Sequence, residues 1–578
     1  MTNNAFYYYF KLVKFFSKKK KIYLFLFFFL SLLTSLTEIL SIGSLVPFIT
    51  LLINPDKIYE NNIFNYFIYN FNLDFSNLVL ILFIVFVSLI TISTLLKILY
   101  IRLNSYLSYG IIKDITNLLF NKIINKSYYN LLKLNSKDIS TTIVLRCQSV
   151  GETNYFFISG VGSLLIIFFL LLNILYFISY KFIYIIFPLF LLYVIFFLFI
   201  KKNISKYSKT VSDNFANITK NIQQVIKFHP EIILYKLNNF FFRDFNKDNY
   251  NLRKAQEGQT FVSSYPSVII QNFVIIILIL LIYYLYSENI LKDKFPLLVL
   301  LFFSIQRIMP NLQNIFQSLT VISFQKDMLK KTLEILEQNQ NDNKNDNSFI
   351  KNNFDSIVFK NIDFEYEKNK TILNNINFRI NKNDIVAIIG ESGAGKTTLV
   401  KIILGFLKPT KGKILLNNKV LNEDFVKFWQ LNIAYLPQQI FILDESLLAN
   451  IALSKNISSL EKKNIYSILK KLDLNYKDIN NVNNKFTAKV GEDGKFFSGG
   501  QIQRIGIARA IFQKREFLIL DESLNALDDK NFNLVINFLK KIDNITILII
   551  SHEKKVINIC NKILEIKKGR IYESTKIK

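Results

Sequence analysis

Six long apolar runs dominate the first part of the chain, separated by shorter polar segments. They lie at about 22–53, 77–101, 156–180, 182–201, 262–287 and 295–323. A helix rises 1.5 Å per residue, so about 20 apolar residues cross the hydrocarbon core of a bilayer. Each run is close to or above that length. We therefore predict six transmembrane helices, with both chain ends on the same side of the membrane.

The connecting segments differ in charge. Lys and Arg concentrate before the first run and in the long loops 102–155 and 202–261, whereas the opposite loops carry balanced charge. The positive-inside rule places the basic segments in the cytoplasm. We expect the helices to extend into these loops, with tips near Tyr128–Leu132 and Tyr235–Phe241 that contact the second domain. Segment 61–71 is read equally well as an interfacial helix or as a plain loop.

A polar, low-complexity stretch, Glu337–Asn347, ends the apolar part of the chain. Such a stretch cannot bury a core. Beyond it, short β-like runs alternate with helical ones, which is typical of an α/β domain. We predict a membrane domain over residues 1–336, a polar linker over 337–352 and an α/β domain over 353–578. The first run is too long for the apolar core of a signal peptide and predicts an uncleaved helix.

Composition narrows the possible functions. The 578 residues carry a formal net charge of +28, with 51% hydrophobic residues and 56 Phe. The Lys residues are spread along the chain and many flank apolar runs, where anionic lipid attracts them. We therefore expect membrane lipid, and no nucleic acid, as a partner. Two Cys and two His, far apart in sequence, predict neither a disulfide framework nor a metal site built from them.

The segment 390–398 (GESGAGKTT) follows an apolar strand and precedes a helix. Glycines there let backbone N–H groups surround phosphate oxygens, and the helix N-terminus adds partial positive charge. In this motif the Lys reaches the β- and γ-phosphates and the following Thr ligates Mg²⁺. We predict an ATP and Mg²⁺ site that includes Gly390, Ser392, Gly393, Gly395, Lys396, Thr397 and Thr398.

A second motif, Phe517–Glu522 (FLILDE), is an apolar strand that ends in two acids. By itself this is a common buried strand. Beside a phosphate-binding loop, Asp521 suits the Mg²⁺ shell and Glu522 suits the polarisation of an attacking water.

Between these motifs lies Phe497-Ser498-Gly499-Gly500-Gln501, followed by Arg504 and Arg509. This set resembles the signature of the ATP-binding cassette family, with Phe497 where the family usually has Leu. The resemblance implies an ATP-binding cassette over 353–578, fused to a six-helix membrane domain of the exporter type. It also implies a homodimer, in which the signature loop (Ser498, Gly499, Gly500 and Gln501) meets the γ-phosphate held by the other copy.

The remaining positions of the cassette follow in order, and the resemblance assigns each a role. Tyr366 would stack on adenine, Gln438 would sense Mg²⁺ and water, and His552 would contact the γ-phosphate. Glu492 resembles an acidic loop of exporters and Asp528 the end of the SALD loop, here NALD. The implied activity is ATP hydrolysis coupled to transport. Its catalytic residues are Glu522, His552 and Gln438, and its metal ligands are Thr397, Gln438 and Asp521.

The membrane domain resembles bacterial lipid-linked oligosaccharide flippases of the protein N-glycosylation pathway, in residues 38–52 (EILSIGSLVPFITLL) and 307–310 (RIMP). The resemblance implies a polyprenyl-pyrophosphate oligosaccharide as substrate and the bacterial inner membrane as location. Independently, Arg307, Lys97 and Glu38 are ionisable residues in or near apolar runs, where they usually face a cavity or a partner. The two cations would pair with a pyrophosphate.

Several alternatives stay open. One alternative to a substrate-binding role is that Glu38 pairs with a neighbouring basic residue and that Arg307 extends to the membrane surface. The alternatives to a lipid-linked oligosaccharide as substrate are lipid A, a phospholipid, a drug and a peptide. A different class of function is a scaffold that binds ATP and does not transport. The presence of Glu522 disfavours it, because a protein that only binds ATP does not need a catalytic acid.

Overall fold

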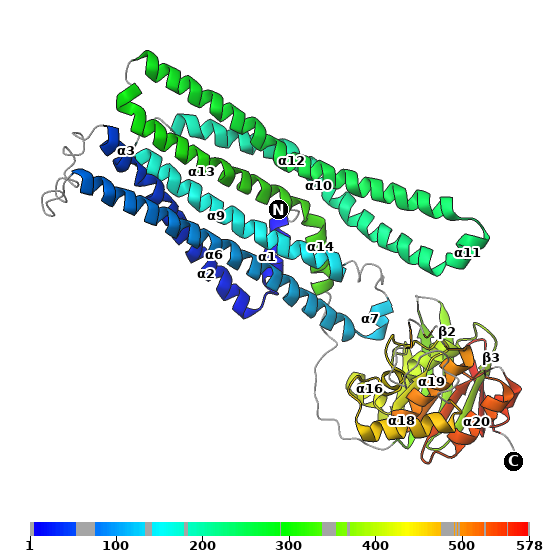
Figure 1. The fold of residues 1–578 in the computed structure, drawn as a ribbon. Helices are drawn as coiled ribbons and strands as arrows, with labels where there is room; N and C mark the ends of the chain where they lie inside the picture. The colour runs from blue at the N-terminus through cyan, green and yellow to red at the C-terminus, as the bar shows by residue number, and fades with distance from the viewer. Residues whose placement is uncertain are drawn as a thin grey trace. The chain divides into compact units, whose positions relative to one another are not determined.

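The structure of the chain is a computed structural model that divides into two compact units (Figure 1). One unit comprises Met1–Lys126 and Asn130–Asn343, and the other Ser127–Tyr129 and Lys344–Lys578. The structure describes residues 5–53, 75–132, 142–177, 183–288, 291–337, 354–366, 370–474, 490–491, 494, 497–524, 527–551 and 553–575.

The first unit is helical. Its long helices are α2 (Lys18–Gly43), α6 (Phe75–Ile124), α9 (Cys147–Phe177), α10 (Ile183–Lys227), α12 (Asn238–Ser287) and α13 (Leu291–Phe324). Shorter elements are α1 (Ala5–Val13), α3 (Leu45–Ile53), α7 (Tyr128–Leu132), the π-helical η1 (Thr142–Arg146), α11 (His229–Leu234) and α14 (Lys326–Glu337). Figure 1 shows the long helices running side by side as a bundle. The helical membrane domain that the apolar runs predict is confirmed.

Five helical stretches of the described residues are long and apolar enough to cross a membrane. They are Lys18–Ile53, Asn77–Ile124, Ile143–Leu172, Asn238–Ser287 and Phe295–Phe324. They coincide with five of the six predicted spans. The fourth predicted span, 182–201, falls almost wholly within α10, whose described part begins at residue 183. Segment 61–71 lies outside the described residues.

α6 and α12 each contain 50 residues. At 1.5 Å per residue each is about 75 Å long, which is more than twice the thickness of a bilayer's hydrocarbon core. Both helices must therefore extend far beyond the membrane, as expected from the basic loops. The second predicted tip is a turn after α11, with α12 beginning at Asn238.

α1 has no counterpart among the predicted elements. Ala5, Tyr9 and Leu12 are buried at helical spacing, so one face of α1 packs inward. Tyr9 and Leu12 join a core with Ile111 of α6 and Leu329 of α14. Nine residues are too few for a membrane span, so a search for long apolar runs passes over this helix. Its position depends on partners that are distant in sequence.

The second unit contains two sheets. A four-stranded antiparallel sheet has the order β2-β1-β4-β5, made of β1 (Ser356–Glu365), β2 (Thr371–Asn381), β4 (Lys411–Leu416) and β5 (Lys419–Val420). A six-stranded sheet has the order β10-β9-β3-β8-β7-β6 and is parallel from β9 to β6. Its strands are β3 (Ile385–Gly390), β6 (Ile433–Leu436), β7 (Phe517–Asp521), β8 (Thr546–Ile550), β9 (Lys562–Lys567) and β10 (Arg570–Thr575).

Helices accompany this parallel sheet, as the alternating pattern predicts. They are α15 (Lys396–Ile403), α16 (Glu423–Gln430), α17 (Leu447–Ala452), α18 (Ser459–Lys471), α19 (Gly499–Phe512), α20 (Asp529–Lys540) and α21 (Lys554–Ile557). β7 and β8 are buried at every residue, which is typical of a parallel sheet covered on both faces. Ligands in such folds bind at the carboxyl ends of the strands. The chemically important residues lie at those ends.

Candidate ATP site and membrane charge cluster

The loop between β3 and α15 surrounds the Lys396 ammonium. Lys396 Nζ donates hydrogen bonds to the carbonyl oxygens of Gly390, at 2.7 Å, and Glu391, at 2.9 Å. The side chain is attached to the first residue of α15, so its charge lies at the positive end of a helix. Burial lowers the pKa of Lys396, whereas the negative charges of Glu522 and Asp521 raise it.

Two glycines of the loop have conformations and surroundings that exclude a side chain. Gly390 has φ of 153°, and a Cβ there would lie 2.5 Å from the carbonyl oxygen of Ile566. Gly395 has φ of 106°, and a Cβ there would lie 2.9 Å from the Leu373 side chain. The loop is thus pressed against β9 and β2, and its backbone is left to contact a ligand.

The two threonines after Lys396 have different surroundings. Thr397 is exposed, whereas Thr398 is buried with its hydroxyl 3.5 Å from the Tyr366 hydroxyl. Thr397 therefore suits a metal, and Thr398 helps to position the tyrosine. Tyr366 remains 42% exposed, and its ring lies edge-on to Phe364 with centroids 4.9 Å apart. An exposed, braced aromatic ring suits stacking on a base.

Asp521 is the last residue of β7, separated from β3 by β8 alone. These strands are parallel, so their carboxyl ends share one edge of the sheet. The Tyr435 hydroxyl on β6 donates a hydrogen bond of 3.1 Å to Asp521 Oδ2. Burial raises the pKa of the Asp521 carboxyl, and this hydrogen bond opposes the effect. A buried carboxylate beside a phosphate loop suits Mg²⁺, which prefers oxygen ligands.

Glu522 follows Asp521 with a left-handed backbone, φ 48°. Its amide N–H donates to the Ile550 carbonyl at 3.0 Å, which ties this turn to the end of β8. Gln438 Nε2 donates a hydrogen bond of 2.7 Å to Glu522 Oε2. Gln438 is exposed and Glu522 is half-buried. The turn therefore directs the Glu522 carboxylate to the open edge of the site, where it meets the side-chain amide of Gln438, 84 residues earlier in the chain.

Ser498 caps the N-terminus of α19. Its hydroxyl accepts from the Gln501 N–H at 3.3 Å, and its own N–H donates to Gln501 Oε1 at 2.8 Å. This capping box shapes the turn, and Gln501 takes part through its side chain. A Cβ on Gly499 would meet nothing within 4 Å, so this face of the turn is open. The loop thus presents a helix N-terminus without a covering side chain.

Asp528 caps α20 and accepts a 3.0 Å hydrogen bond from the Asn531 N–H, which lowers the pKa of its carboxyl. The structure therefore shows a helix cap at this predicted ligand position. His552 and Glu492 lie outside the described residues, so their predicted roles stay predictions. β8, which ends two residues before His552 in sequence, lies between β3 and β7.

Together these residues fit ATP with Mg²⁺. The loop offers a glycine cradle and a buried ammonium for phosphate oxygens, and Thr397, Gln438 and Asp521 offer oxygen donors for a metal. MgATP would supply the polarised γ-phosphate. The residues of the chain would hold it, orient a water and supply a carboxylate to polarise that water.

Two features of this site escaped the sequence analysis. One is Tyr435, which lies in β6 between buried Ala434 and Leu436 and faces Asp521 only through the pairing of β6 with β7. The other is Asn450, a fully buried residue of α17. Arg509 of α19 donates to the Asn450 carbonyl at 2.8 Å and to its Oδ1 at 3.2 Å. Arg509 was recognised only as part of a motif, and in the structure it donates to Asn450 and, at 3.1 Å, to the Phe441 carbonyl.

We expect Tyr435→Phe to raise the Mg²⁺ concentration needed for half-maximal ATPase by about 10-fold. A hydrogen bond to a charged group contributes roughly 1.5–3 kcal/mol, we expect the lower end for this 3.1 Å bond, and Asp521 would lose its orientation. Titration of ATPase with Mg²⁺ at fixed ATP measures the effect. Tyr466→Phe, on the surface of α18, is the matched control. An unchanged Mg²⁺ dependence would contradict the positioning role.

Ser127–Tyr129, which overlap the first predicted tip (Tyr128–Leu132), belong to the second unit. Within that unit the Tyr128 ring stacks on Phe406, with centroids 4.7 Å apart and an angle of 25° between the planes. Lys401 Nζ lies 5.6 Å from the centre of the same ring. Lys401 is on α15, the helix that begins at the phosphate loop. This tyrosine therefore touches the helix that follows the ATP site.

In the membrane unit, the structure brings together the three predicted ionisable residues. Lys97 Nζ of α6 donates to Glu38 Oε1 of α2 at 2.9 Å, and Arg307 Nη1 of α13 lies 3.7 Å from the same oxygen. The Glu38 side chain is 3% exposed, whereas those of Lys97 and Arg307 are 44% and 41% exposed. Glu38 therefore does pair with basic residues, and the cluster keeps one excess positive charge.

Two family models match the chain. The ABC transporter transmembrane region matches residues 21–290, and the ABC transporter model matches residues 373–525. A solved structure of a bacterial Atm1-family ABC exporter with ATP bound has the same fold, with a TM-score of 0.75 over 96% of each chain and 17% identity.

Curated relatives are also similar. An ATP-dependent lipid A-core flippase of Wigglesworthia glossinidia brevipalpis is 31% identical over 65% of this chain and 64% of its own length. A Rickettsia typhi protein, described as a candidate export ATP-binding/permease protein, is 38% identical over 39% of each chain. A leukotoxin translocation ATP-binding protein of a Pasteurella haemolytica-like strain is 36% identical over 38% of this chain and 31% of its own.

The chain thus spans less than two thirds of the length of each of these curated relatives. The two family models, however, describe the transmembrane region and the ATP-binding domain of ABC transporters. The first matches within the first unit of this chain and the second within its second unit. The two units of the chain are therefore similar, in the same order, to the transmembrane region and the ATP-binding domain of ABC transporters, and the chain has the fold of an ABC exporter.

Proposed function

We propose that two copies of this chain form an exporter that hydrolyses ATP to move its substrate across the bacterial inner membrane. The hydrogen bond between Gln438 and Glu522 at the edge of the ATP site carries the catalytic part of the proposal, because it holds a carboxylate and an amide where a water would attack. Each chain contains one phosphate loop and one signature loop, and a complete site needs the phosphate loop of one copy and the signature loop of another. A self-dimer is therefore the simplest way to complete two sites.

In this dimer, ATP would lie between Lys396 of one copy and the Ser498 turn of the other. ATP favours the closed pair because it contacts both copies, and hydrolysis removes the γ-phosphate contacts. Glu522 would polarise the attacking water, with His552 at the γ-phosphate. The contact of Tyr128 with α15 offers a path by which changes at the phosphate loop reach the membrane helices.

For the substrate, we propose an amphipathic lipid with an anionic headgroup, and specifically a polyprenyl-pyrophosphate oligosaccharide. Lys97 and Arg307 keep about 40% of their side-chain surface exposed although both contact Glu38. Cations in a membrane domain are costly and usually serve a polar ligand or partner. A pyrophosphate would form charge-assisted hydrogen bonds with both. The similarity to a lipid A-core flippase supports a lipid substrate of this general kind.

We expect Arg307→Ala to reduce the stimulation of ATPase by the lipid-linked oligosaccharide at least 5-fold, with basal ATPase within 2-fold of the wild type. The guanidinium group of Arg307 would contact the headgroup, so its loss should weaken the response to the lipid. Arg307 belongs to the first unit and the ATP site to the second, so basal hydrolysis should be little affected. ATPase in liposomes with and without added lipid measures both quantities. Arg243→Ala, an exposed residue of α12, is the matched control. Equal loss of basal and stimulated activity would count against a headgroup role.

The alternatives give different results in the same assay. Stimulation by lipid A with no response to the oligosaccharide lipid would change the substrate and keep the anionic site. Stimulation by an uncharged drug, unaffected by Arg307→Ala, would favour a drug exporter. No ATP turnover by the wild type in liposomes would leave the scaffold interpretation.

A further inference from the structure

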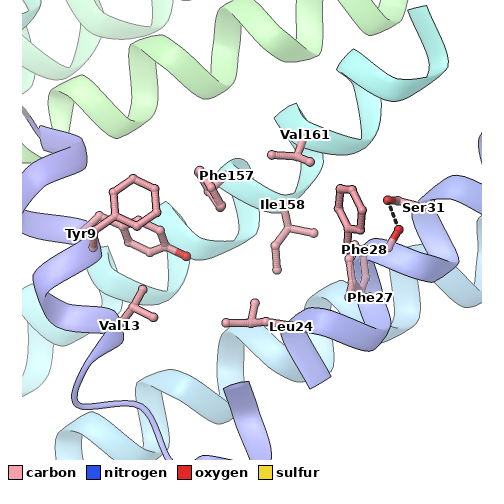
Figure 2. A pocket seen from close by; sticks show the side chains of 10 residues that line it. Tyr9, Val13, Leu24, Phe27, Phe28, Ser31, Phe157, Ile158 and Val161 are labelled. Carbon is pink, nitrogen blue, oxygen red and sulfur yellow. Dashed lines mark hydrogen bonds between the residues drawn. The ribbon is translucent and has the colours of Figure 1, made fainter. Parts of the chain in front are cut away.

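A pocket of about 170 Å³ lies in the membrane unit between α1, α2 and α9 (Figure 2). Its walls include Val13 and Phe10 of α1, Leu24 and Phe28 of α2, and Ile158 and Val161 of α9. The pocket includes none of Glu38, Lys97 and Arg307, so it is separate from the proposed substrate cluster.

The polar side chains of its lining are already engaged. Of the described residues that line the pocket, only Tyr9 and Ser31 carry polar side-chain atoms. The Ser31 hydroxyl donates to the Phe28 carbonyl at 2.6 Å, and the Tyr9 hydroxyl donates to Asn154 Oδ1 at 2.8 Å. An apolar cavity of about 150 Å³ stays dry and takes up a hydrocarbon such as benzene. The pocket is therefore suited to hydrocarbon and not to water.

The wall formed by α1 is held in place by a buried polar chain. Tyr9 is 1% exposed and Asn154 is fully buried, and Asn154 Nδ2 donates in turn to the Ser108 hydroxyl of α6 at 3.0 Å. Rings add to this anchor, because Phe10 and Phe157 meet edge-on with centroids 5.6 Å apart. The pocket is thus formed before any ligand arrives, which lowers the cost of binding.

The pocket opens toward the surroundings of the helix bundle. Phe10 is 54% exposed and Phe28 is 47% exposed, although both line it. α2 belongs to the candidate span that begins at Lys18, so the pocket lies beside the first turns of that span. An occupant would therefore enter from the bilayer, near its boundary with water.

Lysines concentrate at this end of α2. Lys20 and Lys21 precede Leu24 by four and three residues, so all three share a helix face. Lys21 Nζ donates to the Lys14 carbonyl at 3.0 Å, which joins α2 to the end of α1. Five lysines occur between residues 14 and 21 without an acidic residue among them. Lys20 Nζ lies 4.5 Å from the centre of the Tyr106 ring of α6. Ser17, beside the lysines, donates a 2.9 Å hydrogen bond to Asp114 Oδ2.

We propose that this pocket binds a segment of one acyl chain of an anionic glycerophospholipid from the cytoplasmic leaflet, with the headgroup phosphate held by Lys20 and Lys21. The hydrocarbon fills the dry space between α1, α2 and α9, and the phosphate meets the lysines one turn before Leu24. An anionic lipid is selected because lysines near the membrane surface attract negatively charged headgroups.

Photolabelling in vesicles tests this site. The full chain is reconstituted into phosphatidylcholine and phosphatidylglycerol at three to one, with a trace of phosphatidylglycerol that carries a diazirine in its acyl chain. Mass spectrometry after irradiation is expected to find adducts on peptides that contain residues 9–31 and 157–161. Val161→Phe, which fills the pocket, is expected to reduce these adducts at least 5-fold. Val268→Phe, on the exposed face of α12, is expected to leave them unchanged.

A second filling variant protects the test against misfolding. Val13→Phe narrows the pocket from the α1 side and is expected to have the same effect as Val161→Phe. Circular dichroism, gel filtration and basal ATPase identify which variants are folded. Adducts that persist in a folded filling variant, or that occur equally all around the bundle, would overturn the pocket assignment.

The headgroup part is tested with matched probes. In the wild type, the phosphatidylglycerol probe is expected to label the pocket at least 3-fold more than a phosphatidylcholine probe with the same chain. The double variant Lys20→Gln/Lys21→Gln is expected to remove this preference and leave phosphatidylcholine labelling unchanged. Lys201→Gln/Lys202→Gln, an exposed pair in α10, is the control. Equal labelling by the two probes in the wild type would overturn the anionic preference.

Discussion

Replacement of Glu522 by Gln is expected to lower the ATPase rate by at least 100-fold while ATP still binds. A positioned acid or base contributes about 10²- to 10⁴-fold to such a reaction. The Gln side chain has nearly the same shape, so the turn at φ 48° and its backbone bond to Ile550 remain. ATPase in liposomes and binding of a fluorescent ATP analogue measure the two effects separately.

The variant is also expected to accumulate as an ATP-bound dimer, since the contacts of the γ-phosphate are not released. Chemical cross-linking with and without ATP tests this consequence. Glu334→Gln, on the exposed face of α14, is the matched control and should retain full activity. A Glu522→Gln protein that retains more than a tenth of the ATPase rate would rule out Glu522 as the principal catalytic carboxylate.

Replacement of Lys396 by Ala is expected to weaken ATP binding by about 10- to 100-fold and to abolish detectable hydrolysis at micromolar ATP. A hydrogen bond to a charged group contributes roughly 1.5–3 kcal/mol, and Lys396 is the cation that the loop surrounds. Its removal also leaves the Gly390 and Glu391 carbonyls without this donor. Equilibrium titration with the ATP analogue measures the change in affinity.

Lys470→Ala, on the exposed side of α18, is the control for the loss of one positive charge. If the Lys396→Ala protein bound ATP as tightly as the control, the phosphate loop would not hold the nucleotide in the proposed way. The two large predictions are also distinguishable from each other. Glu522→Gln should preserve binding and lose turnover, whereas Lys396→Ala should lose both.

The local pattern of the sequence was enough to predict the elements that carry the ATP site. The apolar strand expected before the phosphate loop is β3 (Ile385–Gly390), and the strand expected within Phe517–Glu522 is β7 (Phe517–Asp521). Runs of apolar residues bounded by glycines or acids depend mainly on neighbours in the chain. For the same reason the apolar runs of the membrane unit were recognisable by length alone.

Some pairings of the site depended on distant parts of the chain. Gln438 meets Glu522, and Tyr435 meets Asp521, because β6 lies in register beside β7. The order of strands in a sheet is a property of the packed domain. The motif resemblance could place Gln438 near the site, but Tyr435 had no such signal and remained unnoticed.

The membrane unit shows the same division. Sequence alone singled out Glu38, Lys97 and Arg307 as costly charges in apolar runs, and it left open whether they face a substrate or each other. The packing of α2, α6 and α13 brings them to one carboxylate oxygen, with both cations still partly exposed. Helix rotation and contact are decided by side-chain packing, which a run of apolar residues does not specify.

By itself, then, the sequence determined the two-part organisation, the membrane-crossing runs and the residues that carry the chemistry of nucleotide binding. Those features rest on periodicity, length and short motifs. Only the tertiary structure decided the sharing of Glu38 between two cations and the placement of α1 over a dry pocket. Both arise where segments distant in sequence meet, and both depend on side-chain packing that no local pattern encodes.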